Sequence, residues 1–454
     1  MTVTLAITDG VWGELRTALA DSREVAGVLS ARPVAGSGSL TLLGRELTWA
    51  PAEAYIDRSP DGLSLRSTGW LPAARAAVAD SCVAIFVHTH PNGEPSFSAQ
   101  DDCVDASLLQ TFSRFGAAGR YASLVVAGSP HQPRPAGRVY PRARHPVMVD
   151  KFRVAGDRIQ IMLGGSAATP DLETFDRQIL VFGPLGQQIL AALKVAVVGA
   201  GGTGSAAAEQ LARLGVGSLT LVDDDIVTDA TPTRGYGMTV SDIGRPKAEV
   251  LADHLCHIGF GTQVNVVTRP VQDPHACDSI QHADVVLCCV DGHGARLVLN
   301  RWAYAHLAPV LDVAVLVSAE GRNVGGIDGR VTWLSPGAAC LLCRGRIDPA
   351  LAYAEMLSPD ERKRLAGEGY AQEAKTAQPA VVTLTSLIAS LATTELLQRL
   401  FGLADSAPTE LLARIQDRDL RRNRVPQRGG CFCSDKTFLA RGLETPYLDL
   451  LWPA

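Results

Sequence analysis

The sequence predicts an α/β protein in which a mixed N-terminal part precedes a doubly wound domain with a parallel sheet. After residue 190, strand-like and helix-like segments alternate, as they do in parallel sheets covered by helices. Before that point, short strands and helices are mixed. The stretch GGSAATPDLE, which begins at residue 164, is small and polar and contains proline, as linkers do. We therefore expect domains at 1–163 and 173–454, joined by a linker at 164–172.

Three elements of the first part carry its chemistry. Residues 81–90 (SCVAIFVHTH) are mostly apolar and β-branched, which predicts a buried strand. Residues 98–115 then predict a helix with Ser98 at its N-cap. Upstream, Glu24 stands at the start of another predicted strand.

The second part begins with a strand at 194–198 that leads into a glycine-rich turn. A helix at 205–215 and strands at 218–225 and 283–291 follow. The polar, charged segment 345–378 is predicted to leave this core as an excursion.

Composition limits the classes of partner. The 42 basic and 47 acidic residues give a net charge of −5, so nothing in the bulk charge predicts a nucleic-acid partner. The basic run 418–424 is interpreted as solvated surface. No apolar run reaches the ~18 residues of a membrane helix, and the N-terminus lacks the pattern of a secretion signal. We expect a cytoplasmic protein without a membrane partner, whose ten cysteines are thiols or metal ligands.

The motif VHTHPNGEPSFSAQDD predicts a metal site. Alternate residues of a strand share a face, so His88 and His90 point the same way, and the next helix can bring Asp101 beside them. Two imidazoles and one carboxylate with an open fourth position are typical of catalytic zinc. Glu24 is the candidate base for the water's proton. The competing interpretation is a capping box, because Ser98 and Asp101 form S-x-x-D.

The full spacing, H-x-H-P, six residues, S, two residues, D, resembles the signature of the JAMM metalloprotease family, and an E-x-x-G lies upstream. The resemblance covers roughly residues 1–160. It implies a cytidine-deaminase-like α+β domain in which His88, His90 and Asp101 bind zinc, Glu24 is the general base and Ser98 steadies the oxyanion. It also implies cleavage of peptide or isopeptide bonds at the C-terminal end of ubiquitin-like proteins.

A second motif, VAVVGAGGTGS, predicts a nucleotide site. It contains G-x-G-x-x-G at Gly199, Gly201 and Gly204, with Gly202 between them, at the junction of a predicted strand and helix. Asp223 follows at the end of the next strand, where a carboxylate can bind ribose hydroxyls. The motif alone leaves NAD, FAD and ATP open.

Charged residues further along favour ATP with magnesium. Asp223 and Asp225 are followed by Arg234, Lys247 and Asp291, which can neutralise phosphates and hold a cation. From about 173 to 434, the ordered set resembles the ThiF and MoeB type of adenylating enzyme in the ubiquitin-activating superfamily.

This second resemblance implies a Rossmann-like domain and a role for each charge. Asp223 binds ribose, Arg234 and Lys247 contact phosphates, and Asp291 holds magnesium. Arg177 reaches the γ-phosphate of the partner's ATP across a homodimer. The family usually has asparagine three residues before the arginine, and this chain has Thr231 there.

Four cysteines predict a structural zinc. Cys340 and Cys343 form C-x-x-C, and Cys431 and Cys433 form C-x-C, which together suffice for a tetrahedral Cys₄ site. The alternative is two separate reduced pairs. Cys288 and Cys289 are expected in the core, and Cys82 and Cys103 are expected to be structural.

The sequence hypothesis is a bifunctional enzyme for a ubiquitin-like or sulfur-carrier protein with a C-terminal glycine. One domain hydrolyses the bond after that glycine, and the other adenylates the freed carboxylate with Mg-ATP. The excursion 345–378 has no cysteine for a thioester, so the acyl group stays on AMP or passes to a conjugating or sulfur-transfer protein. The alternatives are a biosynthetic enzyme that forms a carrier-protein thiocarboxylate, a partly non-catalytic scaffold and an NAD-dependent oxidoreductase.

Overall fold

The computed structural model describes residues 1–91, 93–114, 120–141, 145–165, 173–320, 323–357, 360–361, 364, 379–403 and 409–442. Most of the expected linker and much of the expected excursion lie outside these ranges. The chain forms two compact units. The first holds the described parts of 1–155, 160–167 and 439–442, and the second holds those of 156–159 and 168–438. The exact domain bounds stay a prediction.

The first unit is built on a mixed nine-stranded sheet with the order β11-β10-β1-β3-β2-β6-β7-β8-β9. Its main strands are β1 (Thr2–Thr8), β2 (Ala26–Gly36), β3 (Ser39–Trp49), β6 (Val83–Pro91), β7 (Tyr121–Ser129) and β8 (Gln132–Val139). The shorter strands are β9 (Val147–Met148), β10 (Lys151–Ala155) and β11 (Ile159–Leu163). A separate hairpin joins β4 (Tyr55–Ser59) to β5 (Gly62–Leu65), and the helices are α1 (Asp9–Ala18), α2 (Leu71–Ala79) and α3 (Ala99–Arg114).

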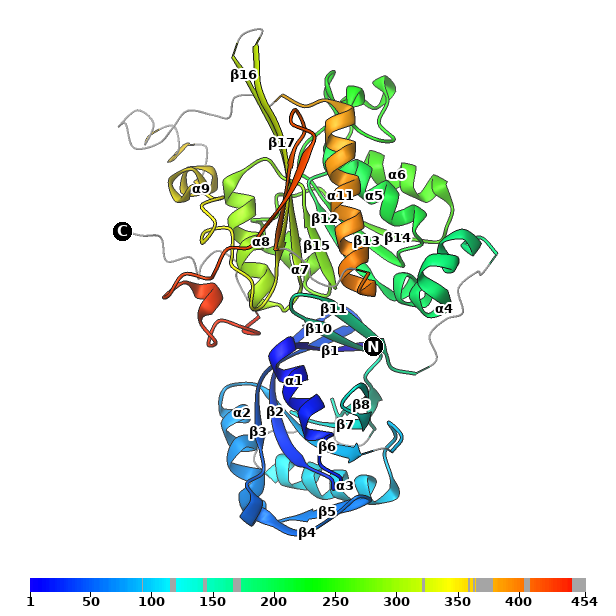
Figure 1. The fold of residues 1–454 in the computed structure, drawn as a ribbon, viewed down its shortest axis with the longest axis vertical. Helices are drawn as coiled ribbons and strands as arrows, with labels where there is room; N and C mark the ends of the chain where they lie inside the picture. Colours follow the sequence, from blue (N-terminus) through cyan, green and yellow to red (C-terminus); the bar gives the residue numbers. More distant parts are fainter. Residues whose placement is uncertain are drawn as a thin grey trace. The chain divides into compact units, whose positions relative to one another are not determined.

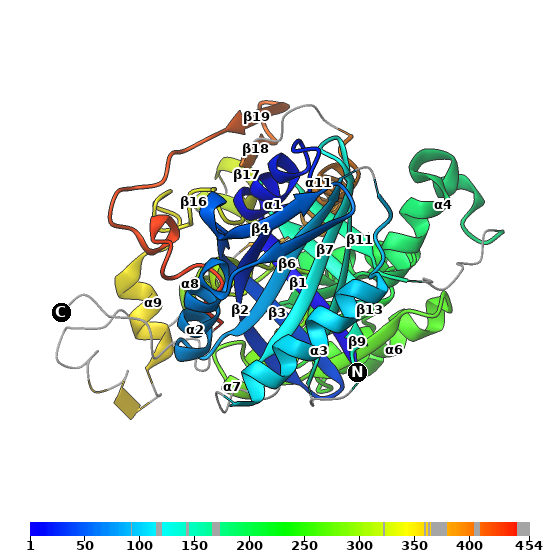
Figure 2. The same cartoon turned by 90° about the horizontal axis from the view of Figure 1, so that it is seen from below.

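The pleat of β6 decides which face carries the histidines. Val83, Ile85 and Val87 join the core that includes α1, whereas Ala84 and Phe86 join the core that includes α2 and α3. Side chains alternate along a strand, so His88 and His90 continue the second series, on the face that carries α3 (Figure 2). The strand and helix predicted here, and the shared face of the two histidines, are confirmed.

The second unit has an eight-stranded sheet with the order β14-β13-β12-β15-β16-β17-β18-β19 (Figure 1). Its strands are β12 (Lys194–Val198), β13 (Ser218–Val222), β14 (Gln263–Val267), β15 (Val285–Cys288), β16 (Val310–Glu320), β17 (Asn323–Leu334), β18 (Glu410–Arg414) and β19 (Asp419–Asn423). Its helices are α4 (Asp176–Ala192), α5 (Gly202–Arg213), α6 (Lys247–Ile258), α7 (Pro274–Ile280), α8 (His293–Ala305), α9 (Pro349–Met356) and α11 (Val382–Phe401).

In the sheet order, the five strands β14, β13, β12, β15 and β16 are parallel to one another. Strands β17, β18 and β19 continue the sheet, and each is antiparallel to its neighbours. The parallel strands run outward in both directions from the pair β12–β15, which makes that pair the topological switch point. Ligands of doubly wound sheets bind beyond the carboxyl ends of the strands at this point. The predicted α/β class with a doubly wound second part is confirmed.

Within the described part of the chain, no helix combines the length and the apolar character that a membrane span requires.

Candidate active sites

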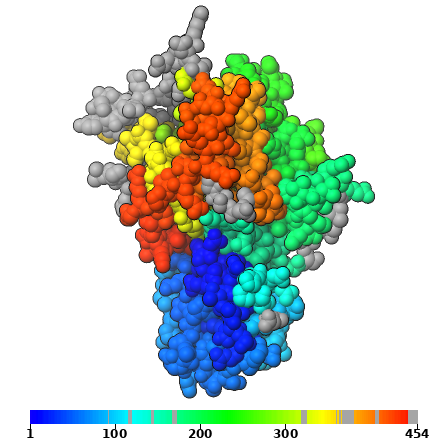
Figure 3. Space-filling view, viewed as in Figure 1, coloured from blue at the N-terminus to red at the C-terminus, as the bar shows by residue number. Residues whose placement is uncertain are grey.

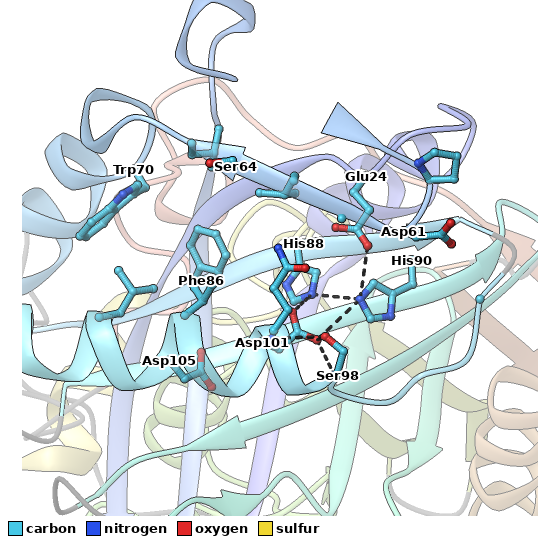
Figure 4. Close-up of a pocket in the computed structure, with 18 of the residues that line it drawn as sticks. Glu24, Asp61, Ser64, Trp70, Phe86, His88, His90, Ser98, Asp101 and Asp105 are labelled. Carbon is cyan, nitrogen blue, oxygen red and sulfur yellow. Dashed lines mark hydrogen bonds and ion pairs between the residues drawn. The ribbon is translucent and has the colours of Figure 1, made fainter. Parts of the chain in front are cut away.

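The predicted metal ligands of the first unit lie together. The Nε2 atoms of His88 and His90 are 3.1 Å apart. His88 Nε2 lies 2.9 Å from Asp101 Oδ1, and His90 Nε2 lies 3.9 Å from Asp101 Oδ2. Glu24 Oε1 lies 3.6 Å from His90 Nε2 (Figure 4). Residues 64 positions apart therefore meet at one point at the carboxyl end of β6.

These donor atoms fit a zinc ion. One atom from each of His88, His90 and Asp101 lies within 4.8 Å of the others. Two nitrogens bound tetrahedrally to zinc at ~2.0–2.1 Å lie about 3.4 Å apart, close to the spacing of the two Nε2 atoms. His90 Nδ1 lies 3.3 Å from the carbonyl oxygen of Glu94, and a hydrogen bond donated there leaves Nε2 free to bind a metal.

Two tethers place Glu24 beside the cluster. Thr89, between the histidines, accepts a hydrogen bond from Val25 N at 2.9 Å and donates its own N–H to Val25 O. Arg58 on β4 donates from Nε to the carbonyl oxygen of Glu24 at 2.6 Å. Burial raises the pKa of Glu24 to about 7. A bound dication would favour the carboxylate and lower that pKa.

Asp101 serves the helix cap and the cluster together. Its Oδ2 accepts hydrogen bonds from Ser98 N at 2.6 Å and Ser98 Oγ at 2.8 Å, and Asp101 N donates to Ser98 Oγ at 3.2 Å. Burial opposes ionisation of Asp101, but the hydrogen bond and charge of His88 outweigh it and hold the pKa below its usual range. The capping box and the ligand cluster are therefore compatible. The oxyanion role of Ser98 stays a prediction.

A cavity of about 660 Å³ opens onto this cluster. One wall is the β4–β5 hairpin, and α3 forms another. Phe86 and Trp70 lie away from Glu24 and His90 in the close-up, whereas Asp61 lies beside them (Figure 4). The sequence reasoning missed these wall residues, because no local spacing marks a residue that reaches the site only through the tertiary fold.

In the second unit, the predicted glycines form a tight turn between β12 and α5. Gly199 has a φ of +94°, and a side chain there would collide with the carbonyl oxygen of Cys289. A Cβ on Gly204 would lie 1.7 Å from the carbonyl oxygen of Gly199. Gly202 begins α5, three residues before the predicted start, and Gly201 is its N-cap. The turn therefore presents bare backbone at a helix N-terminus, as a phosphate site does.

Of the predicted charges, Asp223 and Arg234 contact this turn. Asp223, directly after β13, accepts hydrogen bonds from Ala200 N at 2.5 Å and from Asp225 N at 2.9 Å. Burial raises the pKa of Asp223 above its usual value. Lys247 Nζ, at the start of α6, pairs with Asp225 Oδ2 at 2.7 Å. Arg234 lies against the turn, since its Cγ is 3.3 Å from the position of a Cβ on Gly202.

Asp291 lies in the loop after β15. The glycine turn follows β12, the other strand of the switch-point pair. Arg296 holds this loop by donating to the carbonyl oxygens of Val290 at 2.6 Å and Asp291 at 3.3 Å. Arg296 is anchored in turn by the fully buried Asp312 at 3.0 Å. No sequence spacing pointed to this Arg296–Asp312 pair.

Two residues predicted from the sequence, Arg177 and Thr231, make their contacts with residues outside the glycine turn of the second unit. The Arg177 side chain on α4 is 90% exposed and lies 3.6 Å from Asp176. Thr231 is buried, and its hydroxyl accepts from Thr228 N at 3.0 Å. The Thr231 hydroxyl, which stands where the family has asparagine, therefore stabilises the turn between Thr228 and Thr231.

The four predicted zinc cysteines form one cluster. Cys340 Sγ lies 3.6 Å from Cys431 Sγ, and Cys343 Sγ lies 3.7 Å from Cys433 Sγ. All four sulfur atoms lie within 4.8 Å of one another. Four thiolates bound to one zinc at ~2.3 Å lie roughly 3.8 Å apart, so the spacing fits a tetrahedral zinc, and it is too long for disulfides.

The remaining predicted cysteines divide between core and surface. Cys82 and Cys288 are buried, and Cys289 is half-buried. Cys103, which was expected to be structural, is exposed on α3. That expectation was wrong because the helix turns this position away from the sheet.

Comparison with protein families assigns both parts of the chain. The model of the ThiF family matches residues 175–431, more than half of the chain. The chain belongs to the ThiF family. Residues 15–139 match the model of prokaryotic homologs of the JAB domain, so this ThiF protein carries a JAB domain at its N-terminus. JAB is another name for the JAMM type of domain, and the two predicted resemblances are confirmed.

Curated relatives match more than a third of the chain. The SAMP-activating enzyme E1 of Haloferax volcanii is 31% identical over 174 residues, which cover 38% of this chain and 61% of that protein. The sulfur carrier protein ThiS adenylyltransferase of Escherichia coli is 34% identical over 158 residues, 34% of this chain and 61% of that protein. The chain thus spans about three fifths of these relatives. A crystal structure of E. coli MccB with ATP has a TM-score of 0.44 at 16% identity, covering 57% of this chain and 73% of that one.

Proposed function

We propose that this ThiF protein is a bifunctional enzyme that trims the C-terminus of a ubiquitin-like or sulfur-carrier protein and then adenylates it. The observation that carries the proposal is that one chain holds both the ligand cluster on β6 and α3 and a glycine turn contacted by Asp223 and Arg234. The order of the steps follows from chemistry, because trimming exposes the carboxylate that adenylation needs. The names of the relatives, an activating enzyme and a carrier-protein adenylyltransferase, support this substrate class.

In the hydrolytic step, Glu24 acts as the general base. Zinc held by His88, His90 and Asp101 would lower the pKa of a water molecule and polarise the substrate carbonyl. Glu24 would accept a proton from the attacking water while the water oxygen bonds to the carbonyl carbon, and would pass that proton to the leaving nitrogen as the C–N bond breaks, which gives an amine and a carboxylic acid that ionises to the carboxylate. The Ser98 hydroxyl, which donates to Asp101 Oδ2, would have to turn toward the substrate to donate to the oxyanion. The walls of the cavity hold the extended C-terminal segment.

In the adenylation step, a carboxylate oxygen of the terminal glycine attacks the α-phosphorus of ATP. The bond to the bridging oxygen breaks, and pyrophosphate leaves. Asp223 holds the ribose, Arg234 and Lys247 neutralise phosphate charge, and Asp291 is the residue that would hold magnesium. Lys247 is paired with Asp225, so phosphates would compete with Asp225 for its ammonium group.

The test uses a ubiquitin-like protein that carries a short extension after its terminal glycine. We expect intact-mass spectra to show loss of the extension with zinc alone and an added AMP, or released pyrophosphate, once Mg-ATP is present. Trimming without activation would contradict the second step, and activation of a pre-trimmed partner without trimming would contradict the first. Retention of NAD but not ATP on the purified chain would favour the oxidoreductase alternative.

The cysteine cluster yields a stability prediction. Replacement of Cys433 by serine should remove one zinc per chain and lower the thermal midpoint of the second unit by roughly 10 °C, since loss of a metal is among the few single changes worth ~4 kcal/mol or more. Elemental analysis and thermal unfolding measure both effects. Cys256→Ser is the matched control, because Cys256 is exposed on α6 outside the cluster. Equal zinc content in the two variants would disprove the site.

We also propose that the second unit forms a homodimer through α4. Leu180 and Val181, before a kink at Gly183, and Leu185, after it, are 80%, 63% and 63% exposed, and a second copy would cover them. The helix protrudes from its unit in the space-filling view (Figure 3). The family resemblance implies that Arg177, which is exposed in one chain, reaches the nucleotide site of the second copy in such a dimer. Light scattering should give twice the 48.0 kDa chain mass, and a monomer would refute the proposal.

A further inference from the structure

We propose that Arg138 on β8 is a positioning residue that holds the first turn of α3 so that Asp101 meets the two histidines. The proposal rests on the zinc site of the proposed function. Neither the motif nor either resemblance involves Arg138, which lies 37 positions beyond Asp101 in the chain.

A single guanidinium contacts α3 and its approach at three points. Arg138 Nε donates to Asp105 Oδ2 at 2.6 Å, and Nη1 donates to Asp102 Oδ1 at 2.6 Å. The face of the guanidinium lies over the ring of Phe97, 3.9 Å from its centroid. Phe97 directly precedes the N-cap serine, so the three contacts flank Asp101 on both sides.

Asp105 is the buried end of this clamp. Its carboxylate also accepts hydrogen bonds from Tyr121 Oη at 2.5 Å, Ser123 Oγ at 2.7 Å and Tyr140 Oη at 2.7 Å. The side chains of Asp105 and Arg138 are 5% and 8% exposed. These donors come from β7, β8 and the residue after β8, so the carboxylate fastens α3 to the sheet.

The first turn of α3 has no apolar anchor of its own. The buried residues of this helix are Asp105, Leu108 and Phe112, all on the C-terminal side of Asp101. The first turns of helices fray unless something outside the helix holds them. Asp105 follows Asp101 by four residues, about 6 Å along the axis and on the same face. Fixing Asp105 and Asp102 therefore fixes where the Asp101 carboxylate stands.

The geometry requires arginine and not merely a positive charge. Two different nitrogens of one planar group reach two carboxylates while its face covers an aromatic ring. A lysine ammonium is a point charge on a flexible stem and cannot make all three contacts at once. Removal of the guanidinium leaves the Asp105 charge buried without its cation, which favours displacement of α3.

The test compares four full-length variants with the wild-type chain by Co²⁺ binding. A fifth variant, Asp101→Ala, is the blank, because the Co²⁺ that it still binds is held by the cysteine cluster and not by the histidine site. Arg138→Met should weaken Co²⁺ binding at this site about tenfold, the lower end of what loss of a supporting group costs, and should change the visible spectrum that reports coordination geometry. Arg138→Lys should restore only part of the Co²⁺ affinity and only part of the wild-type visible spectrum. Asp102→Asn should give a smaller change of the same kind, and unfolding cannot explain it because that side chain is 65% exposed.

Arg45→Met is the matched control, since Arg45 is an ion-paired arginine of the same unit whose partner Asp80 lies off α3. We expect Arg45→Met to bind Co²⁺ like the wild-type chain. If Arg138→Met and Asp102→Asn match Arg45→Met in affinity and spectrum while the wild-type chain binds, the positioning role of Arg138 is wrong and the zinc site stands. A wild-type chain that binds no more Co²⁺ than Asp101→Ala overturns the zinc site and the inference together.

Discussion

Replacement of Asp101 by alanine should reduce hydrolysis by more than about 100-fold and leave adenylation unchanged. Mutation of a group that only supports a metal ligand already lowers metal affinity or activity about 10–100-fold, and Asp101 is placed to be a ligand itself. Its carboxylate lies 2.9 Å from His88 Nε2 and carries a depressed pKa, so it is ionised at neutral pH and ready to bind a cation. The measurement is the rate of loss of a C-terminal extension by intact mass, together with ATP–pyrophosphate exchange on a pre-trimmed partner.

Loss of the helix cap is the main competing cause of such an effect. Asp101 also accepts two hydrogen bonds from Ser98, and removal of a cap costs about 1 kcal/mol. Asp101→Asn separates the two roles, because an amide oxygen can still accept from Ser98 but binds zinc weakly. We expect the asparagine variant to keep the helix and lose hydrolysis. Asp80→Ala, at the exposed end of α2, is the control. Wild-type hydrolysis by either Asp101 variant would disprove the ligand role.

The sequence predicted the parts of both sites that depend on short-range geometry. The strand period places His88 and His90 on one face, and a single helical turn brings Ser98 to Asp101. Gly199 and Gly204 were predictable for a similar reason, since both are forced by one turn in which a side chain would strike the backbone. In each case the spacing along the chain already encodes the distance in space.

Residues brought in by long-range folding left no such trace. Arg138 reaches Asp105 across 33 positions, and Arg58 reaches Glu24 across 34. The cysteine pairs lay 90 and 91 positions apart, and only the chemistry of four thiols suggested their meeting. Arg177 marks another limit, because its predicted target belongs to a second copy of the chain. A single sequence reports the type of such residues but not the partner that gives them a role.

Replacement of Asp291 by alanine should have the reverse effect of Asp101→Ala, with adenylation reduced roughly 10²–10³-fold and hydrolysis intact. A divalent cation contributes several kcal/mol to stabilising developing charge, and ~1.36 kcal/mol corresponds to a factor of ten. Asp291 stands after β15 at the switch point, opposite the glycine turn that would hold the phosphates. ATP–pyrophosphate exchange at several magnesium concentrations measures the loss.

The dependence on magnesium distinguishes a cation ligand from a residue that merely shapes the loop. The carbonyl oxygens of Val290 and Asp291 accept hydrogen bonds from Arg296, and both bonds remain possible in the alanine variant because they involve the backbone. The expected result is a higher magnesium concentration for half-maximal exchange, with ATP binding in the absence of magnesium little changed. Asp417→Ala, on the exposed turn between β18 and β19, should behave like the wild-type chain. A variant that loses trimming as well as exchange while remaining folded would refute two independent sites, because each cluster is built within its own unit.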